Sequence, residues 1–208
     1  MTVRLPLAVV LLSAAVAARA GLFGRDKVVS RWTAAPIAVN GDDADWDAES
    51  AFESDGLSVQ ARNDASDLYL IISAHTREGR DRLTGETREN VAIWFVGADG
   101  RTREWGAVLP FSHRAPLTAA LRDPAGVDPE PEYARAVGPA VSTSSWPAEM
   151  PVRLASSARR PVWELKVPLK SLSRRPDGSV ALDVVVTPAA KREGVSLSAS
   201  VKLADKVK

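Results

Sequence analysis

The stretch LSVQARNDASDLYLIISA, residues 57–74, decides the fold. Leu57, Val59 and Ala61 alternate with polar residues, which is the period-two pattern of a half-buried strand. The NDASD cluster that follows is rich in turn-forming residues, and the apolar run 68–74 after it predicts a second strand. Two strands joined by so short a turn pair as a hairpin, so this stretch predicts an antiparallel sheet.

The rest of the chain repeats this pattern. In VWELKV, Trp163, Leu165 and Val167 oppose Glu164 and Lys166, and VSLSASVKL alternates in the same way. The predicted strands are 37–39, 57–63, 68–74, 91–96, 101–109, 141–146, 152–155, 162–167, 180–187 and 195–203. Short strands at regular spacing, without a long amphipathic helix, predict an all-β antiparallel sandwich of jelly-roll or immunoglobulin-like type, with about nine to ten strands and little helix.

The first twenty residues, MTVRLPLAVVLLSAAVAARA, have the pattern of a cleavable export signal. Arg4 is the basic start, an apolar stretch follows, and Ala18-Arg19-Ala20 is a small-x-small cleavage site before Gly21. The apolar residues 5–18 are fewer than the ~20 that span a bilayer. We therefore expect an exported, periplasmic or secreted protein with no membrane span after signal cleavage. Its expected parts are a lead-in over 21–35 and one domain over 36–208, with a long Pro-rich loop near 110–139.

Composition and motifs exclude several classes of function. Lys plus Arg number 27 and Asp plus Glu 26, and a net charge of +1 gives no global reason to bind nucleic acid. The absence of cysteine excludes disulfides, thiolate metal sites and Cys nucleophiles. No GxSxG, HExxH, P-loop or GxGxxG motif occurs, and His75 and His113 are the only histidines. No acid is expected inside an apolar run, where burial would suit it to general-acid catalysis. A non-enzyme is predicted, and any hydrolase role would belong to an exported partner enzyme.

Motifs in four places, taken in order, resemble carbohydrate-binding module family 9 and its DOMON-like relatives in exported bacterial proteins. They are IAVNGDDADWDAESAF (37–52), the hairpin stretch above, ENVAIWFVGADG (89–100) and VWELKVPLKSL (162–172). The chain departs from the family pattern at Ala92, where an acidic residue usually accompanies the aromatic, and between residues 109 and 152, which match no part of it. The resemblance implies a β-sandwich that docks on a carbohydrate ligand without catalysis.

Saccharide recognition needs flat aromatic faces with polar groups at their edges. Trp94 is the best candidate, because period two points it away from the stripe of Val91, Ile93 and Phe95. Trp146 stands at a predicted strand end, whereas Trp105 continues a core-like stripe, so a core position is favoured for it. The candidate sugar-binding residues are Trp94, Trp146, Trp105, Asn90, Arg103 and Glu104.

Other readings stay open. Trp46, in DADW, is predicted to be structural and to plug one end of the sandwich. Asp42, Asp43 and Asp45 are candidate ligands of a structural calcium ion, although a solvated turn with Asx hydrogen bonds is the favoured interpretation. Under a rival hypothesis the sandwich holds b-type haem with Met150 as an axial ligand, and otherwise no cofactor is expected. A third hypothesis is a partner-binding scaffold without sugar affinity, and in every case we expect a monomer.

Overall fold

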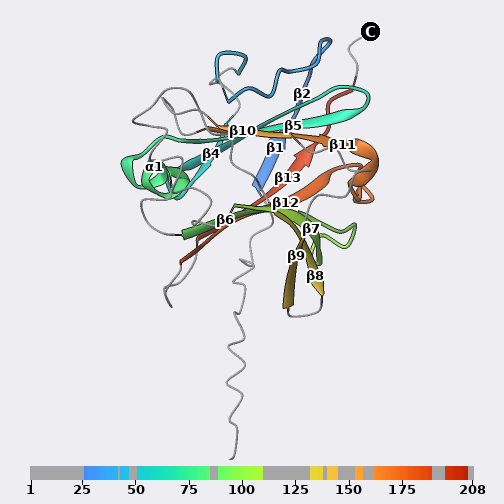
Figure 1. Cartoon of the computed structure of the whole chain (residues 1–208). Coiled ribbons are helices and arrows are strands. Elements are labelled where there is room, and N and C mark those ends of the chain that lie inside the picture. Colours follow the sequence, from blue (N-terminus) through green and yellow to red (C-terminus); the bar gives the residue numbers. More distant parts are fainter. Residues whose placement is uncertain are drawn as a thin grey trace, which may run out of the picture.

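Two β-sheets face each other across an apolar core (Figure 1). The structure is a computed structural model, and it describes residues 26–41, 43–46, 51–84, 89–109, 132–137, 140–144, 153–156, 162–188 and 195–205. Its strands are β1 (Asp26–Val29), β2 (Arg31–Trp32), β3 (Phe52–Ser54), β4 (Leu57–Asn63), β5 (Asp67–Ala74), β6 (Glu89–Val96), β7 (Arg103–Leu109), β8 (Glu132–Val137), β9 (Ala140–Ser144), β10 (Arg153–Ser156), β11 (Val162–Pro168), β12 (Val180–Pro188) and β13 (Val195–Lys202). One α-helix, α1 (Arg77–Thr84), and a short 3₁₀ helix, η2 (Leu169–Ser171), complete the described elements.

The seven-stranded sheet has the order β1-β13-β12-β6-β7-β8-β9, and the six-stranded sheet has the order β10-β11-β5-β4-β2 with β3 also paired to β4. The hairpin predicted from residues 57–74 is confirmed, because β4 and β5 pair antiparallel from Leu57 with Ala74 to Asn63 with Leu68. The β-sandwich is confirmed as well. It differs from the expectation in being mixed, since β1 with β13 and β2 with β4 pair in parallel.

The segment expected to be a lead-in contributes strands to both sheets. β1 joins the seven-stranded sheet and β2 joins the six-stranded sheet, so the chain crosses from one layer to the other at Ser30. Ser30 is buried; its backbone N–H donates to the carbonyl of Lys202 at 2.9 Å, and its hydroxyl donates to Asn63 Oδ1 at 2.6 Å. These contacts supply partners for polar groups that the crossover would otherwise bury alone.

Two further segments differ from the prediction. Residues 37–39 form no strand; Ile37 is instead buried in a cluster outside the main core. Its short apolar run fits a covering loop as well as a strand. Strand β8 lies inside the region expected to be a long loop, and it pairs antiparallel with β7. Residues 110–131 lie outside the described residues.

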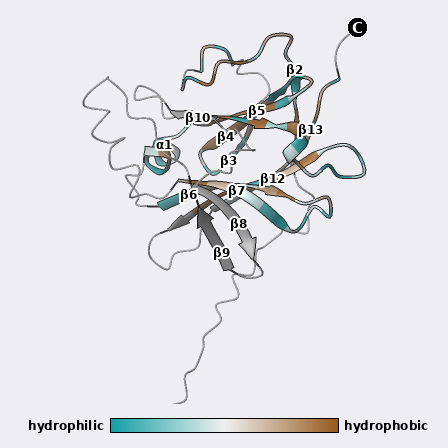
Figure 2. Ribbon diagram, turned by 45° about the vertical axis from the view of Figure 1, so that its right-hand side comes forward, coloured by the Kyte–Doolittle hydropathy of each residue, from teal (hydrophilic) through white to brown (hydrophobic). Residues whose placement is uncertain are grey.

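The core lies between the sheets. Leu68, Leu70 and Ile72 of β5 face inward and belong to the same buried cluster as Val91 and Ile93 of β6, each at most 1% exposed. Figure 2 shows these hydrophobic segments along the strands of both layers. Within the described residues, no helix has the length and apolar character needed to cross a membrane.

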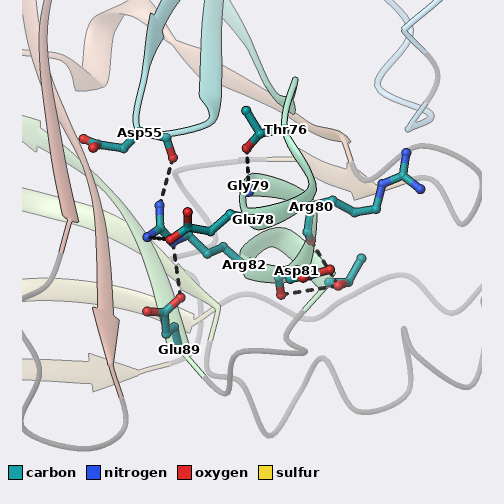
Figure 3. A network of polar contacts seen from close by, with 9 residues as sticks. Asp55, Thr76, Glu78, Gly79, Arg80, Asp81, Arg82 and Glu89 are labelled. Atoms are coloured by element: carbon teal, nitrogen blue, oxygen red, sulfur yellow. Dashed lines mark hydrogen bonds and ion pairs between the residues drawn. The ribbon is translucent and has the colours of Figure 1, made fainter.

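Helix α1 is held to the sandwich by the largely buried side chain of Arg82 (Figure 3) and by a close backbone contact. The Arg82 side chain is 11% exposed; it donates to the carbonyl of Asp55 at 2.8 Å and pairs with Glu78 and with Glu89. A Cβ atom on Gly79 would lie 2.0 Å from the carbonyl oxygen of Gly56, so glycine is required there. The helix therefore joins the turn before β4 to the first residue of β6.

Candidate functional site

The predicted sugar-binding face is the outer face of the seven-stranded sheet. Trp94 points away from Ile93 and Phe95, which belong to the main core, and the predicted orientation is confirmed. In the strand register Trp94 pairs with Asp183 of β12 on one side and with Gly106 of β7 on the other. A carboxylate on β12, an indole on β6 and a glycine on β7 therefore lie side by side across the middle of the sheet.

The indole of Trp94 is closely packed on this face. Its residue is 4% exposed and clusters with Ala92, while Val108 and Val185 pack against the pair. A Cβ atom on Gly106 would lie 3.0 Å from the indole, so the absence of a side chain there leaves room for the ring. Trp94 is therefore a supporting element of the face with little exposed ring.

Arg103 and Asp183 form an ion pair beside this indole. Arg103 Nε donates to Asp183 Oδ2 at 3.2 Å, and the guanidinium carbon lies 5.8 Å from the centroid of the Trp94 ring. The side chain of Asp183 is 8% exposed and that of Arg103 is 33% exposed. A carboxylate this deeply buried needs a charged or hydrogen-bonding partner, and the pair and the cation–π contact fix the guanidinium in place.

A shift in the register between β6 and β7 sets the position of Arg103 and separates it from the role of its neighbour Glu104. Phe95 pairs with Trp105, whereas Val96 pairs with Arg103, so Glu104 is an extra residue on β7. Such an insertion redirects side chains locally. The Glu104 carboxylate accepts a hydrogen bond from the Ser173 hydroxyl at 2.7 Å, and it is exposed.

The remaining candidates separate. Asn90 is the second residue of β6, the strand that carries Trp94; it is half-buried, and period two puts it on the same face. Trp105 lies in the core, as favoured by its stripe; its ring centroid is 4.4 Å from that of Phe95 and its Nε1 donates to the carbonyl of Ser171. Trp146 and Met150 lie outside the described residues, so their roles stay predictions.

Glu164 is a functional-looking residue that sequence reasoning missed. It is 1% exposed on the outer face of the six-stranded sheet, so the expectation that no acid is buried in an apolar run is wrong. Its Oε2 accepts the backbone N–H groups of Asn40 at 2.8 Å and Gly41 at 2.7 Å, and its Oε1 accepts Trp46 Nε1 at 2.7 Å. Both oxygens are engaged by protein donors, which identifies a structural carboxylate.

Trp46 is buried at 9% exposure, so its structural role is confirmed, but its position differs from the one expected. It packs with Ile37, Tyr69 and Ile71 on the outer face of the six-stranded sheet, where Figure 1 shows the N-terminal segment crossing that layer. The Arg62 guanidinium lies 5.5 Å from its ring centroid. Tyr69 and Ile71 of β5 explain this placement, because they would face water on the outer side of the sheet if Trp46 did not cover them.

The turn between β4 and β5 is fixed by Asp64. Its Oδ1 accepts the N–H groups of Ser66 and Asp67, each at 2.7 Å, and its Oδ2 accepts the hydroxyl of Tyr69 at 2.9 Å. Burial raises the pKa of Asp64, but these hydrogen bonds and the charge of Lys166 outweigh it and hold the pKa below its ordinary value. Burial and the hydrogen bond to Asp64 raise the pKa of Tyr69 well above its ordinary value.

The calcium hypothesis stays a prediction. Asp42 lies outside the described residues, Asp43 is half-buried and Asp45 is exposed. Among the residues that the structure describes, no group of three or more His, Cys, Asp or Glu side chains is placed to hold a metal ion.

Comparison with solved structures finds similar folds, two of which are carbohydrate-binding modules. The chain is similar to a carbohydrate binding module family 9 from Caldicellulosiruptor kristjanssonii in complex with glucose, at 8% identity and a TM-score of 0.42, with 88% of this chain and 99% of that one covered. It is also similar to such a module from the same organism in complex with cellotriose, at 11% identity and a TM-score of 0.41, with 88% and 95% covered. No protein-family model matches the chain. No curated protein sequence matches it either.

Proposed function

We propose that this chain is a non-catalytic carbohydrate-binding module whose ligand docks on the outer face of the seven-stranded sheet. The observation that supports this is the cross-strand group of Trp94, Arg103 and Asp183. A pyranose presents hydroxyl groups as well as C–H faces, and this group presents a partly exposed guanidinium that a buried indole and a buried carboxylate hold in place.

Arg103 is the member of the group that a ligand reaches most directly. Its side chain is 33% exposed, whereas Trp94 beneath it is 4% exposed. Guanidinium N–H groups that point outward bind hydroxyl oxygens, while the ion pair to Asp183 keeps them in one orientation. Trp94 then acts as the platform that holds Arg103, and its edge adds apolar contact. Asn90 and Trp146 are proposed as further contacts.

The proposal includes no catalytic step. Both oxygens of Glu164 accept protein N–H groups, and Asp183 is paired with Arg103, so neither buried carboxylate is placed to transfer a proton to a glycosidic oxygen. We further propose that residues 1–20 direct export and are removed, and that the mature module acts as a monomer beside an exported enzyme that supplies the chemistry.

The test compares two matched substitutions on opposite faces of one sheet. Trp94→Phe and Trp105→Phe each shorten an indole to a phenyl ring, and both are measured by thermal melting and by calorimetric titration with cellotriose. We expect Trp94→Phe to weaken binding about tenfold, equivalent to ~1.4 kcal/mol, because the platform under Arg103 is lost. Trp105→Phe should lower the melting temperature and leave the affinity of the folded protein unchanged.

The proposal is wrong if the parent protein binds no glycan on a broad array, or if the two variants bind alike.

One observation favours a second candidate function, a partner-binding scaffold without sugar affinity. The 4% exposure of Trp94 matches a sheet face that is packed for stability. Under that function Trp94→Phe lowers the melting temperature as Trp105→Phe does, and no glycan binds.

A further inference from the structure

A second concave site lies at a different place in the fold. A cleft of about 970 Å³ is lined by the turn before β5 and by the segment that follows β11, and it shares no residue with the Trp94 face. Its lining residues are Ala65, Ser66, Asp67, Lys166, Pro168, Leu169, Lys170, Leu172 and Arg174. This volume is at the upper end of the range typical of small-molecule sites.

The cleft carries surplus positive charge. Lys166 Nζ lies 3.0 Å from Asp67 Oδ2, so these two charges neutralise each other. Lys170 and Arg174 are both exposed, and within the described part of the chain neither has an acidic partner. The nearby Asp64 has both oxygens engaged by its own turn and by Tyr69. A concave surface with unpaired cations concentrates anions and orients them.

The remaining lining is suited to a sugar ring. Pro168, Leu169 and Leu172 contribute apolar atoms, and Ser66 adds a hydroxyl. The backbone N–H of Leu169 already donates to the carbonyl of Ser66 at 2.8 Å, so the two sides of the cleft are held together before any ligand arrives. A preformed cleft avoids the ordering cost of binding.

We infer that this cleft binds an acidic saccharide, with the carboxylate of a uronate unit paired to Lys170 and Arg174. Arg174 can bind a carboxylate through two parallel N–H groups, and Lys170 adds a point charge. Asp67 stays paired with Lys166 and forms the wall. The anionic part of this inference rests on the cleft alone, whereas its saccharide part rests on the proposed function.

The experiment titrates the intact protein with trigalacturonate and, as a neutral match, with cellotriose. The test variant is Lys170→Gln/Arg174→Gln. Its control is Arg77→Gln/Arg80→Gln, which removes the same charge from exposed positions on α1, at the opposite end of the sandwich (Figure 1). We expect trigalacturonate to bind the parent and the control equally. Its affinity for the test variant should fall about tenfold or more, because a charge-assisted pair is lost. Added salt should weaken binding to the parent.

Three results overturn the inference: no binding of trigalacturonate to the parent, equal weakening in both double variants, or competition by sodium sulfate at the same concentration as trigalacturonate. The last would mean a simple anion site. Thermal melting of each variant checks its folding, and both should melt with the parent because the replaced side chains are exposed. Failure of the proposed function is distinguishable, because it would abolish cellotriose binding or make it independent of Trp94, whereas failure of this inference would remove the effect of Lys170→Gln/Arg174→Gln on trigalacturonate.

Discussion

Replacing Glu164 by glutamine tests the structural carboxylate with almost no change in volume. In the native protein Oε2 accepts two backbone N–H groups, from Asn40 and Gly41, and Oε1 accepts the indole N–H of Trp46. The glutamine amide has one oxygen, so its NH₂ group must face a donor on the other side. At least one charge-assisted hydrogen bond is lost and its buried donor remains unpaired, at a cost of ~1–3 kcal/mol, and the loss of the charge from the remaining bonds adds ~1 kcal/mol. The expected loss in the free energy of unfolding is therefore ~2–4 kcal/mol.

Urea denaturation and thermal melting measure this loss. For a domain of this size a loss of ~2–4 kcal/mol lowers the melting temperature by roughly 4–16 °C. Glu104→Gln is the matched control, because Glu104 is exposed, and it should change stability by less than ~0.5 kcal/mol. Trp46→Phe combined with Glu164→Gln should cost less than the sum of the two single changes, since both remove the same hydrogen bond. An unchanged melting temperature for Glu164→Gln would refute this reasoning.

Further predictions concern the helix, an acidic turn and the crossover between sheets. Gly79→Ala should cost ~1–3 kcal/mol, because the added Cβ would lie 2.0 Å from the carbonyl oxygen of Gly56. Hydrogen bonds from the hydroxyl and backbone N–H of Thr102 lower the pKa of Asp99 to about 2, so it contributes stability that is full above pH ~4 and lost as pH falls toward 2. Asp99→Asn should make the melting temperature depend less on pH over that interval. Asn63→Ala should cost ~2 kcal/mol or more in urea denaturation and speed hydrogen exchange in β1, because its buried amide joins the crossover to the C-terminal segment.

Each of these has a contrasting outcome. Helix propensity alone favours alanine over glycine, so an unchanged or raised stability of Gly79→Ala would contradict the close contact, whereas Arg80→Ala, which is exposed on the same helix, should change stability little. Parallel acid profiles for the parent and Asp99→Asn would contradict the assigned pKa. Unchanged exchange rates in β1 would show that the crossover does not depend on Asn63.

The hairpin at 57–74 was predictable because its information is local. Alternation in β4, a turn and the apolar run of β5 follow one another in the chain, and the register from Leu57 to Leu68 agrees with them. β1 and β2 were missed because they have four and two residues, and their parallel partners β13 and β4 lie far away in sequence. Periodicity cannot appear in so short a strand.

The sequence predicts toward which face of the sheet the side chains of the candidate site point, but not how exposed they are. Alternation points Trp94 outward, but its burial depends on Gly106, Val108 and Val185 from the neighbouring strands. For Glu164 the same alternation suggests solvent, and the N-terminal segment with Trp46 covers it instead. A signal was present in the Asn-Gly turn followed by Trp, since such a turn leaves backbone N–H groups that need an acceptor.

The two outer faces combine an acid with a tryptophan in different ways, and the difference bears on function. Glu164 accepts the indole N–H of Trp46, and its oxygens are otherwise occupied by backbone donors. Arg103 instead lies over the ring of Trp94 and keeps a side chain that is 33% exposed. We therefore expect Arg103→Lys to weaken cellotriose binding about tenfold while the melting temperature changes little, because lysine keeps the charge but lacks the planar N–H fork. Glu164→Gln should lower the melting temperature and leave the affinity for cellotriose unchanged. Loss of affinity in both variants would mean that the two faces are not independent.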